Sequence, residues 1–308
     1  MSSDNRIPLP CGTELRLSDV TYIIRGVVGY GGSCLAYSAE RKPSEYEQNI
    51  GMPLTPAVIK EFYPAELTSA ISRIGSNLCL KSIHSEFFSK IKHRFEAGTV
   101  NQARFFTKDG DHSYAPTRIA QANGTVYSSV DSVQGEILTN ACGKLEIVEI
   151  AEIMQSLAYS VKSLHDNGML HLDIKPSNIF LFNKNGSESR RIALFDFDTV
   201  LPIEAIATAN ITFSDGWSPY EQIALQRGSI SYETDIYSIG AVFYWLVSGG
   251  QKVTDDVLNA IKRKRFDFID EFSVLANKVS PRENVKNFLF ATLKRDPAER
   301  VHRIEELL

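Results

Sequence analysis

The sequence contains few cysteines, and their spacing does not suggest a scaffold. Its 308 residues include four, and no two of them form a C-x-x-C pair. Scattered cysteines in small number favour free thiols and a reducing compartment over a disulfide framework, so we expect a cytoplasmic protein. The four are Cys11, Cys34, Cys79 and Cys142.

Long apolar runs and an excess of positive charge are also missing. No stretch reaches the roughly 18 to 20 apolar residues that cross a membrane, and the opening MSSDNRIPLPCGTEL lacks the apolar core of a signal peptide. The formal net charge of −4 argues against nucleic acid as a partner, because nucleic-acid-binding surfaces are basic. What remains is the composition of an ordinary globular protein, with 43% hydrophobic and 23% charged residues.

The periodicity of the apolar residues changes near the middle of the chain. After a turn-rich lead-in over residues 1–19, strand patterns dominate residues 20–130, apart from a helical stretch over 85–106. After Gly135 helical spacing takes over, most clearly over 147–164. We therefore expect an α+β protein in which a small strand-rich half precedes a larger helical half, with a ligand in the cleft between them.

The stretch HLDIKPSNIFLF, residues 171–182, places many polar groups between an apolar helix and an apolar strand. Buried polar groups are costly unless they have partners, so these residues are candidates for chemistry. A predicted strand pair follows and ends in LFDFD, which brings Asp173, Asn178 and Asp196 to one end of a hairpin. Two carboxylates and an amide oxygen suit Mg²⁺. Lys175 can neutralise a transferring phosphate, and Asp173 can orient a hydroxyl and accept its proton.

These residues resemble the protein kinase superfamily, and the resemblance extends along almost the whole chain. The catalytic-loop pattern H-R-D-x-x-x-x-N matches His171, Asp173 and Asn178, and D-F-G matches Asp196 and Phe197. Other segments follow in the family's order: GYGGSC is similar to the glycine-rich loop, AVIK to the lysine strand, GWSPYEQ to the A-P-E segment and RDPAER to a late helix. The catalytic-loop signal is specific, whereas the glycine cluster alone is weak. KEFYP and SPYEQ resemble the bacterial Ser/Thr branch.

The resemblance implies a nucleotide site in the cleft between the two halves. It makes Lys60 the lysine that pairs with the phosphates. Glu96, chosen over Glu86 in the same helix, would hold Lys60. The residues implied to contact the nucleotide are Val28, Gly29, Gly31, Cys34, Val58, Lys60 and Phe180, with a hinge from Asp131 to Val133 whose backbone bonds adenine.

Structural roles in the helical half are also implied by the resemblance. Asp235 would brace the catalytic loop, although it could instead be a plain N-cap of its helix. Glu221 would pair with Arg300, although Arg300 could instead be a surface charge. These elements shape a platform for a peptide, which favours a protein substrate.

Three positions depart from the family's pattern. Leu172 replaces the arginine of H-R-D, Asp198 replaces the glycine of D-F-G, and Cys34 replaces the third glycine of the loop. In the family this arginine meets a phosphate on the activation segment, which here is residues 198–220. Leu172 cannot do so, and we expect apolar packing to order this segment without phosphorylation. Candidates for this packing are Ile203, Ile206, Ile211, Phe213 and Trp217; alternatively, Arg190 or Arg191 replaces the missing arginine.

We interpret the chain as a two-lobed protein kinase fold, with a β-rich lobe over 20–133 and a helical lobe over 134–308. The resemblance implies ATP, Mg²⁺ or Mn²⁺, and a protein acceptor. Lys175, two residues after Asp173, resembles the Ser/Thr kinases, which implies a Ser/Thr hydroxyl as the acceptor. Autophosphorylation is also expected. Two alternatives stay open: a pseudokinase that binds nucleotide or partners, and a small-molecule phosphotransferase of similar fold. The sequence leaves open the substrate, the oligomeric state and whether the chain is a whole kinase or a domain of a longer protein.

Overall fold

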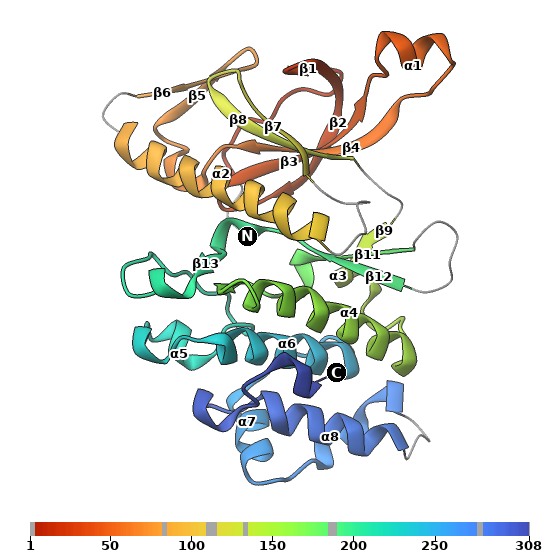
Figure 1. The fold of residues 1–308 in the computed structure, drawn as a ribbon, viewed down its shortest axis with the longest axis vertical. Helices are drawn as coiled ribbons and strands as arrows, with labels where there is room; N and C mark the ends of the chain where they lie inside the picture. The colour runs from red at the N-terminus through yellow and green to blue at the C-terminus, as the bar shows by residue number, and fades with distance from the viewer. Residues whose placement is uncertain are drawn as a thin grey trace. The chain divides into compact units, whose positions relative to one another are not determined.

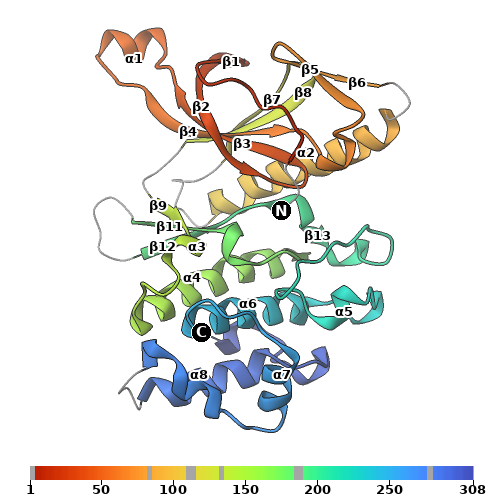
Figure 2. The ribbon, with the colours of Figure 1, turned by 180° about the vertical axis from the view of Figure 1, so that it is seen from behind.

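The structure, a computed structural model, describes residues 4–81, 85–108, 116–131, 135–183, 190–275 and 280–307. Packing divides the chain into two compact units, Met1–Val133 and Gln134–Leu308, and each is described by itself (Figures 1 and 2). The first is rich in strands and the second in helices, which is the architecture expected of a protein kinase fold. Within the described ranges, no helix is both long and apolar enough to span a bilayer.

The first unit is built on an antiparallel sheet with the strand order β1-β2-β3-β4-β8-β7. Alternation along β4 turns Ile59 and Glu61 toward the core and places Val58 and Lys60 on the opposite face. The strands are β1 (Glu14–Leu17), β2 (Val20–Tyr30), β3 (Cys34–Arg41), β4 (Thr55–Phe62), β7 (Pro116–Ala122) and β8 (Thr125–Asp131), with a separate hairpin of β5 (Ile71–Ile74) and β6 (Asn77–Leu80).

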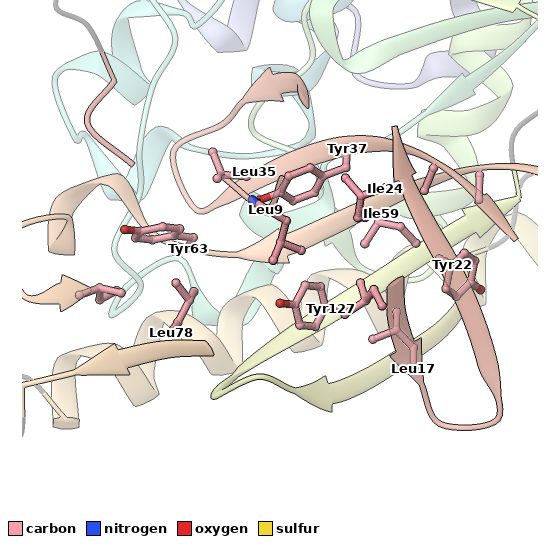
Figure 3. Close-up of a cluster of buried hydrophobic side chains, with 14 of the residues drawn as sticks. Leu9, Leu17, Tyr22, Ile24, Leu35, Tyr37, Ile59, Tyr63, Leu78 and Tyr127 are labelled. Atoms are coloured by element: carbon pink, nitrogen blue, oxygen red, sulfur yellow. The ribbon is translucent and has the colours of Figure 1, made fainter. Parts of the chain in front are cut away.

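Helix α2 (Ser85–Lys108) packs against β7 and β8, while the short α1 (Glu45–Asn49) lies between β3 and β4 in the chain (Figure 1). A large cluster of buried side chains, which includes Leu9, Tyr37 and Tyr127, fills the core of this unit (Figure 3). Leu9 is only 2% exposed. The expectation of a loose lead-in is therefore wrong for residues 4–19, because their apolar side chains complete this core and part of them forms β1.

The second unit contains short sheets and most of the helices. Its strands are β9 (Gly135–Ile137), β11 (Ile179–Asn183) and β12 (Arg190–Leu194), in the order β12-β11-β9, together with the pair β10 (Met169–Leu170) and β13 (Leu201–Pro202). Its helices are α3 (Leu138–Ala141), α4 (Ile147–His165), α5 (Tyr220–Ile223), α6 (Tyr232–Val247), α7 (Asp255–Lys262) and α8 (Ser280–Thr292).

The predicted helix over 147–164 is confirmed as α4, and the chain reverses at Gly168, whose φ is +72°. Helix α6 packs against α4 and α8 (Figures 1 and 2). It is buried from Thr234 to Val247, as its almost wholly apolar sequence predicts. The helices expected near the end of the chain are instead short 3₁₀ turns, Pro297–Glu299 and Ile304–Leu307.

Candidate active site

The polar stretch 171–178 forms a loop between β10 and β11. Its path is fixed by Leu172, which takes a left-handed conformation (φ +63°), and by Pro176, which begins a 3₁₀ turn. A non-glycine residue with positive φ is uncommon and persists only where its surroundings hold it. The backbone conformation of this loop therefore fixes the positions from which the side chains of Asp173 and Lys175 extend.

Asp173 is the centre of a hydrogen-bond network. Its Oδ2 accepts from Lys175 Nζ at 2.8 Å and from Asn178 Nδ2 at 3.0 Å. Its Oδ1 accepts from the hydroxyl of Ser214 at 2.6 Å, and the same hydroxyl accepts from Lys175 Nζ at 3.0 Å. The carboxylate therefore holds a hydroxyl on one oxygen and an ammonium on the other. The Ser214 contact, which joins residues 41 positions apart, was not predicted from the sequence.

A buried carboxylate on helix α6 binds the backbone of this loop. Asp235, which is fully buried, accepts from the backbone N–H groups of His171 at 2.8 Å and Leu172 at 2.9 Å and pairs with His165 Nε2 at 2.9 Å. Burial alone would raise the pKa of Asp235, but the hydrogen bonds and charge of its partners outweigh burial and lower it. The expectation that Asp235 braces the catalytic loop is confirmed, although His165 was not foreseen.

The two expected metal ligands lie close together at the ends of neighbouring strands. The backbone N–H of Phe195 donates to the carbonyl of Asn178 at 2.9 Å, and the next residue, Asp196, is left-handed with φ +68° and ψ +63°. Because the amide nitrogen of Asn178 faces Asp173, its amide oxygen is directed elsewhere. One carboxylate and one amide oxygen fit a hard cation such as Mg²⁺, which usually keeps water and phosphate oxygens as its other ligands. No group of three or more His, Cys, Asp or Glu that could hold a metal occurs in the described ranges.

Lys60 and Val58 share one face of β4, as a nucleotide-binding role requires. In α2, the carboxylate of Glu96 lies 3.8 Å from the ammonium of Lys92, one helical turn earlier. The pairing of Glu96 with Lys60 therefore stays a prediction. Phe180 of β11, in the second unit, packs so close to Gly135 that a Cβ at Gly135 would meet the Phe180 ring at 2.6 Å.

The glycine cluster forms the turn between β2 and β3. Cys34 is 6% exposed and packs with Phe62, Phe95 and Val126, so its side chain is part of the core, and both its carbonyl and its sulfur lie close to Gly31 in the turn. Gly29 and Gly31 lie on the other side of the turn, and the neighbouring Val28 is 59% exposed. Of the predicted hinge, Asp131 ends β8 opposite Ala57, and Val133 lies outside the described residues.

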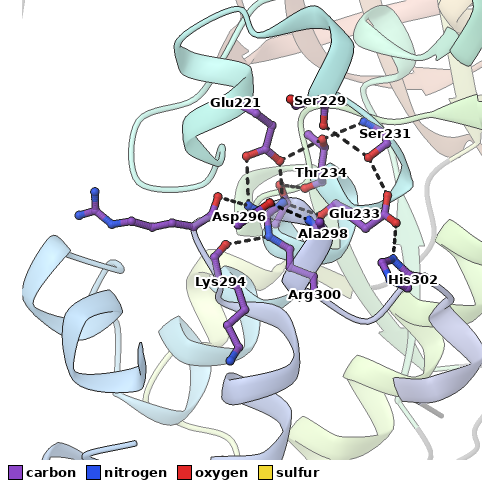
Figure 4. Close-up of polar contacts among 12 residues, drawn as sticks. Glu221, Ser229, Ser231, Glu233, Thr234, Lys294, Asp296, Ala298, Arg300 and His302 are labelled. Carbon is purple, nitrogen blue, oxygen red and sulfur yellow. Dashed lines mark hydrogen bonds and ion pairs between the residues drawn. The ribbon is translucent and has the colours of Figure 1, made fainter. Parts of the chain in front are cut away.

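Glu221 and Arg300 form a buried ion pair (Figure 4). Nη1 and Nη2 of Arg300 contact the two carboxylate oxygens at 2.6 and 3.0 Å, and both side chains are at most 1% exposed. Arg300 also donates to the carbonyls of Glu233, Lys294 and Arg295. The predicted pair is confirmed, and the alternative of a surface charge is wrong.

Leu172 packs into a small apolar cluster with parts of the activation segment. The cluster's buried members are Leu170, Leu172, Ile206, Ile211 and Ile230, with Ile203 packed against them. Phe213 is 54% exposed, so the expectation that it joins this packing is wrong. Trp217 instead packs edge-on against Trp245, with the ring centroids 6.0 Å apart.

Polar contacts hold the same segment. The buried amide of Gln222 donates to the carbonyls of Leu172 and Thr212, both at 2.7 Å. Arg227 donates to the carbonyls of Ile206 and Ala209, at 2.6 and 2.8 Å. Gln222 thus joins the activation segment to the catalytic loop, and Arg227 holds the segment farther along. Neither donor role was predicted from the sequence.

A catalytic loop built around Asp173, braced by Asp235 and followed by the Glu221–Arg300 pair, is the arrangement of a protein kinase. Comparison with known families agrees, because the sequence model for the protein kinase domain matches residues 117–308. The chain belongs to this family.

Several curated relatives are protein kinases. The chain is 30% identical to chicken smooth-muscle myosin light chain kinase over 50% of its length and 8% of that protein. It is 30% identical to the death-associated protein kinase dapk-1 of Caenorhabditis elegans over 56% of its length and 12% of that protein. It is 24% identical to serine/threonine-protein kinase PknA of Mycobacterium tuberculosis over 74% of its length and 53% of that protein. The chain thus spans only part of each of these relatives.

Solved structures show the same fold. The apo form of PpkA-294 superposes with a TM-score of 0.67 at 22% identity, covering 97% of this chain and 98% of that one. The kinase domain of Mycobacterium tuberculosis PknI gives a TM-score of 0.60 at 18% identity, covering 98% of this chain and 96% of that one.

Proposed function

We propose that this protein kinase transfers the γ-phosphoryl group of ATP to serine and threonine hydroxyls of proteins, including its own. The observation that carries the proposal is the Asp173 carboxylate, which holds the Ser214 hydroxyl on one oxygen and the Lys175 ammonium on the other. A general base must orient the attacking hydroxyl, and a nearby cation stabilises the phosphoryl group in transfer. The similarity to PknA, a serine/threonine-protein kinase, supports the choice of acceptor.

The remaining roles are assigned by the same proposal. Asn178 and Asp196 hold Mg²⁺ or Mn²⁺, which supplies positive charge to the phosphates when bound. Lys60 aligns the phosphates and Glu96 orients Lys60. The glycine turn, with Gly29, Gly31 and Cys34, is proposed to receive the phosphates. The residues proposed to contact the rest of the nucleotide are Val28, Val58, Phe180 and the backbone of 131–133.

Replacing Asp173 by asparagine tests the assignment. We expect Asp173→Asn to lower phosphotransfer by about 10²- to 10⁴-fold, because the amide cannot accept the hydroxyl proton, while binding of ATP stays near wild type. The measurement is transfer from radiolabelled ATP to a general protein substrate, followed by phosphoamino-acid analysis. Asp166→Asn is the matched control, since that aspartate is 57% exposed and pairs with Lys162 on the surface.

The outcomes separate the alternatives. Label on serine or threonine of the protein that disappears in Asp173→Asn supports the proposal. ATP binding without transfer in the wild type identifies a pseudokinase. Transfer to small hydroxyl compounds but not to protein identifies a small-molecule phosphotransferase.

A further inference from the structure

The segment Asp4–Leu9 precedes the first strand and contains a buried cation outside all the motifs described above. The side chain of Arg6 is 1% exposed. Its Nε and Nη2 donate to the carboxylate of Asp4 at 2.9 and 2.6 Å, and this hydrogen bonding lowers the pKa of Asp4. The charge of Arg6 is therefore balanced, and its remaining nitrogen is turned inward.

That nitrogen donates to the backbone at two points, one at the end of the glycine turn and one directly after β4. Nη1 of Arg6 donates to the carbonyl of Tyr63 at 2.6 Å and, more weakly, to the carbonyl of Cys34 at 3.4 Å. Cys34 begins the strand that leaves the turn, and Tyr63 directly follows β4, the strand of Lys60. The planar guanidinium donates in several directions at once, which a lysine cannot reproduce.

The glycine turn is fastened to the same stretch of chain by its own backbone. The N–H of Tyr63 donates to the carbonyl of Ser33 at 3.0 Å, and the N–H of Ala65 donates to the carbonyl of Gly32 at 2.9 Å. Three successive carbonyls, from Gly32 to Cys34, thus accept hydrogen bonds from Arg6 or from residues 63–65.

The segment that carries Arg6 is itself anchored in the core. Arg73 Nε donates to the carbonyl of Ile7 at 2.7 Å, and the N–H of Leu9 donates to the hydroxyl of Tyr37 at 3.1 Å; Figure 3 shows Leu9 beside Tyr37. Both anchors hold Arg6 in place independently of the turn. The segment Asp4–Leu9 is therefore anchored at two points. Among its residues, all of which the structure describes, Arg6 is the only buried cation, and it is directed at the turn.

We propose that Arg6 is a positioning residue for nucleotide binding: it pins the glycine turn in the shape that receives the phosphates. The proposal rests on the proposed function, which assigns the phosphates to this turn. A turn that is ordered before binding loses less conformational entropy when the nucleotide arrives. Loss of Arg6 should therefore weaken nucleotide binding by about tenfold, the effect of one hydrogen bond to a charged group, with kcat changing much less.

The test compares Arg6→Met and Arg6→Lys with Arg16→Met, a control at an exposed arginine of β1. Hydrogen–deuterium exchange of residues 29–34 and 63–65 is measured without nucleotide. Binding of a non-hydrolysable ATP analogue with Mg²⁺ is then measured by calorimetry, and KM for ATP and kcat by phosphotransfer.

We expect faster exchange at both stretches, weaker binding and a raised KM in Arg6→Met, intermediate values in Arg6→Lys, and wild-type values in Arg16→Met. Unchanged exchange in Arg6→Met, or a lower kcat with unchanged binding and KM, overturns the proposal. If Arg6→Met does not fold, the same readouts on Arg6→Lys decide. If the wild type transfers no phosphate, the proposed function has failed, and exchange and analogue binding still decide the role of Arg6.

Discussion

Both units bury an arginine against a glutamate, but the two carboxylates are supported differently. In the second unit, Arg300 contacts both oxygens of Glu221, and the hydroxyl of Thr234 donates to Glu221 from the longer distance of 3.2 Å (Figure 4). Most of the support of this carboxylate therefore comes from a single side chain.

In the first unit, the support of the carboxylate is shared. Glu61, which is fully buried, accepts from Arg73 at 2.5 Å and from the hydroxyls of Tyr37 and Tyr127, each at 2.6 Å. Burial and the charge of Glu61 raise the pKa of both tyrosines, so both remain donors. The loss of unfolding free energy when a buried arginine is replaced therefore depends on which donors still bind its glutamate partner.

The largest effect is expected for Arg300→Met. Glu221 would be left buried with one weak donor, which should cost about 3–5 kcal/mol of unfolding free energy. Denaturant unfolding followed by tryptophan fluorescence measures this, because both tryptophans, Trp217 and Trp245, lie in the second unit. Arg295→Met is the control, since Arg295 is 51% exposed beside Asp255, and such pairs contribute about 0–1 kcal/mol. Equal effects of the two variants would contradict a buried pair.

Arg73→Met should cost less, about 1–3 kcal/mol, because Tyr37 and Tyr127 still donate to Glu61. Hydrogen exchange in β4 and β8 reports the stability of the first unit. Adding Tyr127→Phe should raise the cost by more than Tyr127→Phe does alone. Strict additivity of the two changes would show that the tyrosine does not support the carboxylate.

A smaller, pH-dependent effect is expected in the second unit. Burial lowers the pKa of His171 below its ordinary value of 6.5, so in mildly acidic solution the unfolded chain binds a proton that the folded chain does not. This contribution to stability is present above pH 6.5 and is lost as the pH falls below it, by at most about 1.4 kcal/mol per pH unit. The pKa of Asp235 is also lowered, but Asp235 changes the unfolding free energy only when the pH falls toward and below its ordinary pKa of 3.8. Unfolding followed by tryptophan fluorescence between pH 7 and pH 5 should show a shallower slope in His171→Phe; identical slopes would exclude His171 as the source.

The two buried glutamates also differ in how far their roles could be predicted from the sequence. The catalytic loop and the Glu221–Arg300 pair were predicted because each carries a short motif in the family's order. Glu61 lies in KEFYP, but no role was predicted for it. The alternation of β4 places it on the core side, and an acidic residue at an apolar position was a usable signal.

Other contacts could not be predicted from local patterns. The hydroxyl of Ser214 meets Asp173, and the guanidinium of Arg6 meets the glycine turn, only after distant segments have packed. The prolines and polar residues of the lead-in are typical of loose chain and concealed the burial of Leu9. Long-range packing, not local propensity, decides all three.

The smallest expected effect is that of removing phosphate from the activation segment. The Glu221–Arg300 pair shows the second unit using charge to join distant segments, whereas around Leu172 it uses apolar contact with Ile206 and Ile211. A phosphate would find no arginine at position 172, and the exposed Arg191 lies on β12. We therefore expect phosphatase-treated protein to keep its initial rate on an exogenous substrate. Mass spectrometry must first show that no phosphate remains at Thr199, Thr208, Thr212, Ser214 and Ser218.

Leu172→Ala should reduce that rate by loosening the cluster, whereas Leu225→Ala, at a residue that is 47% exposed, serves as the matched control. A bare segment that is inactive, and recovers only when one of these hydroxyls is phosphorylated again, would show that charge and not apolar packing orders it.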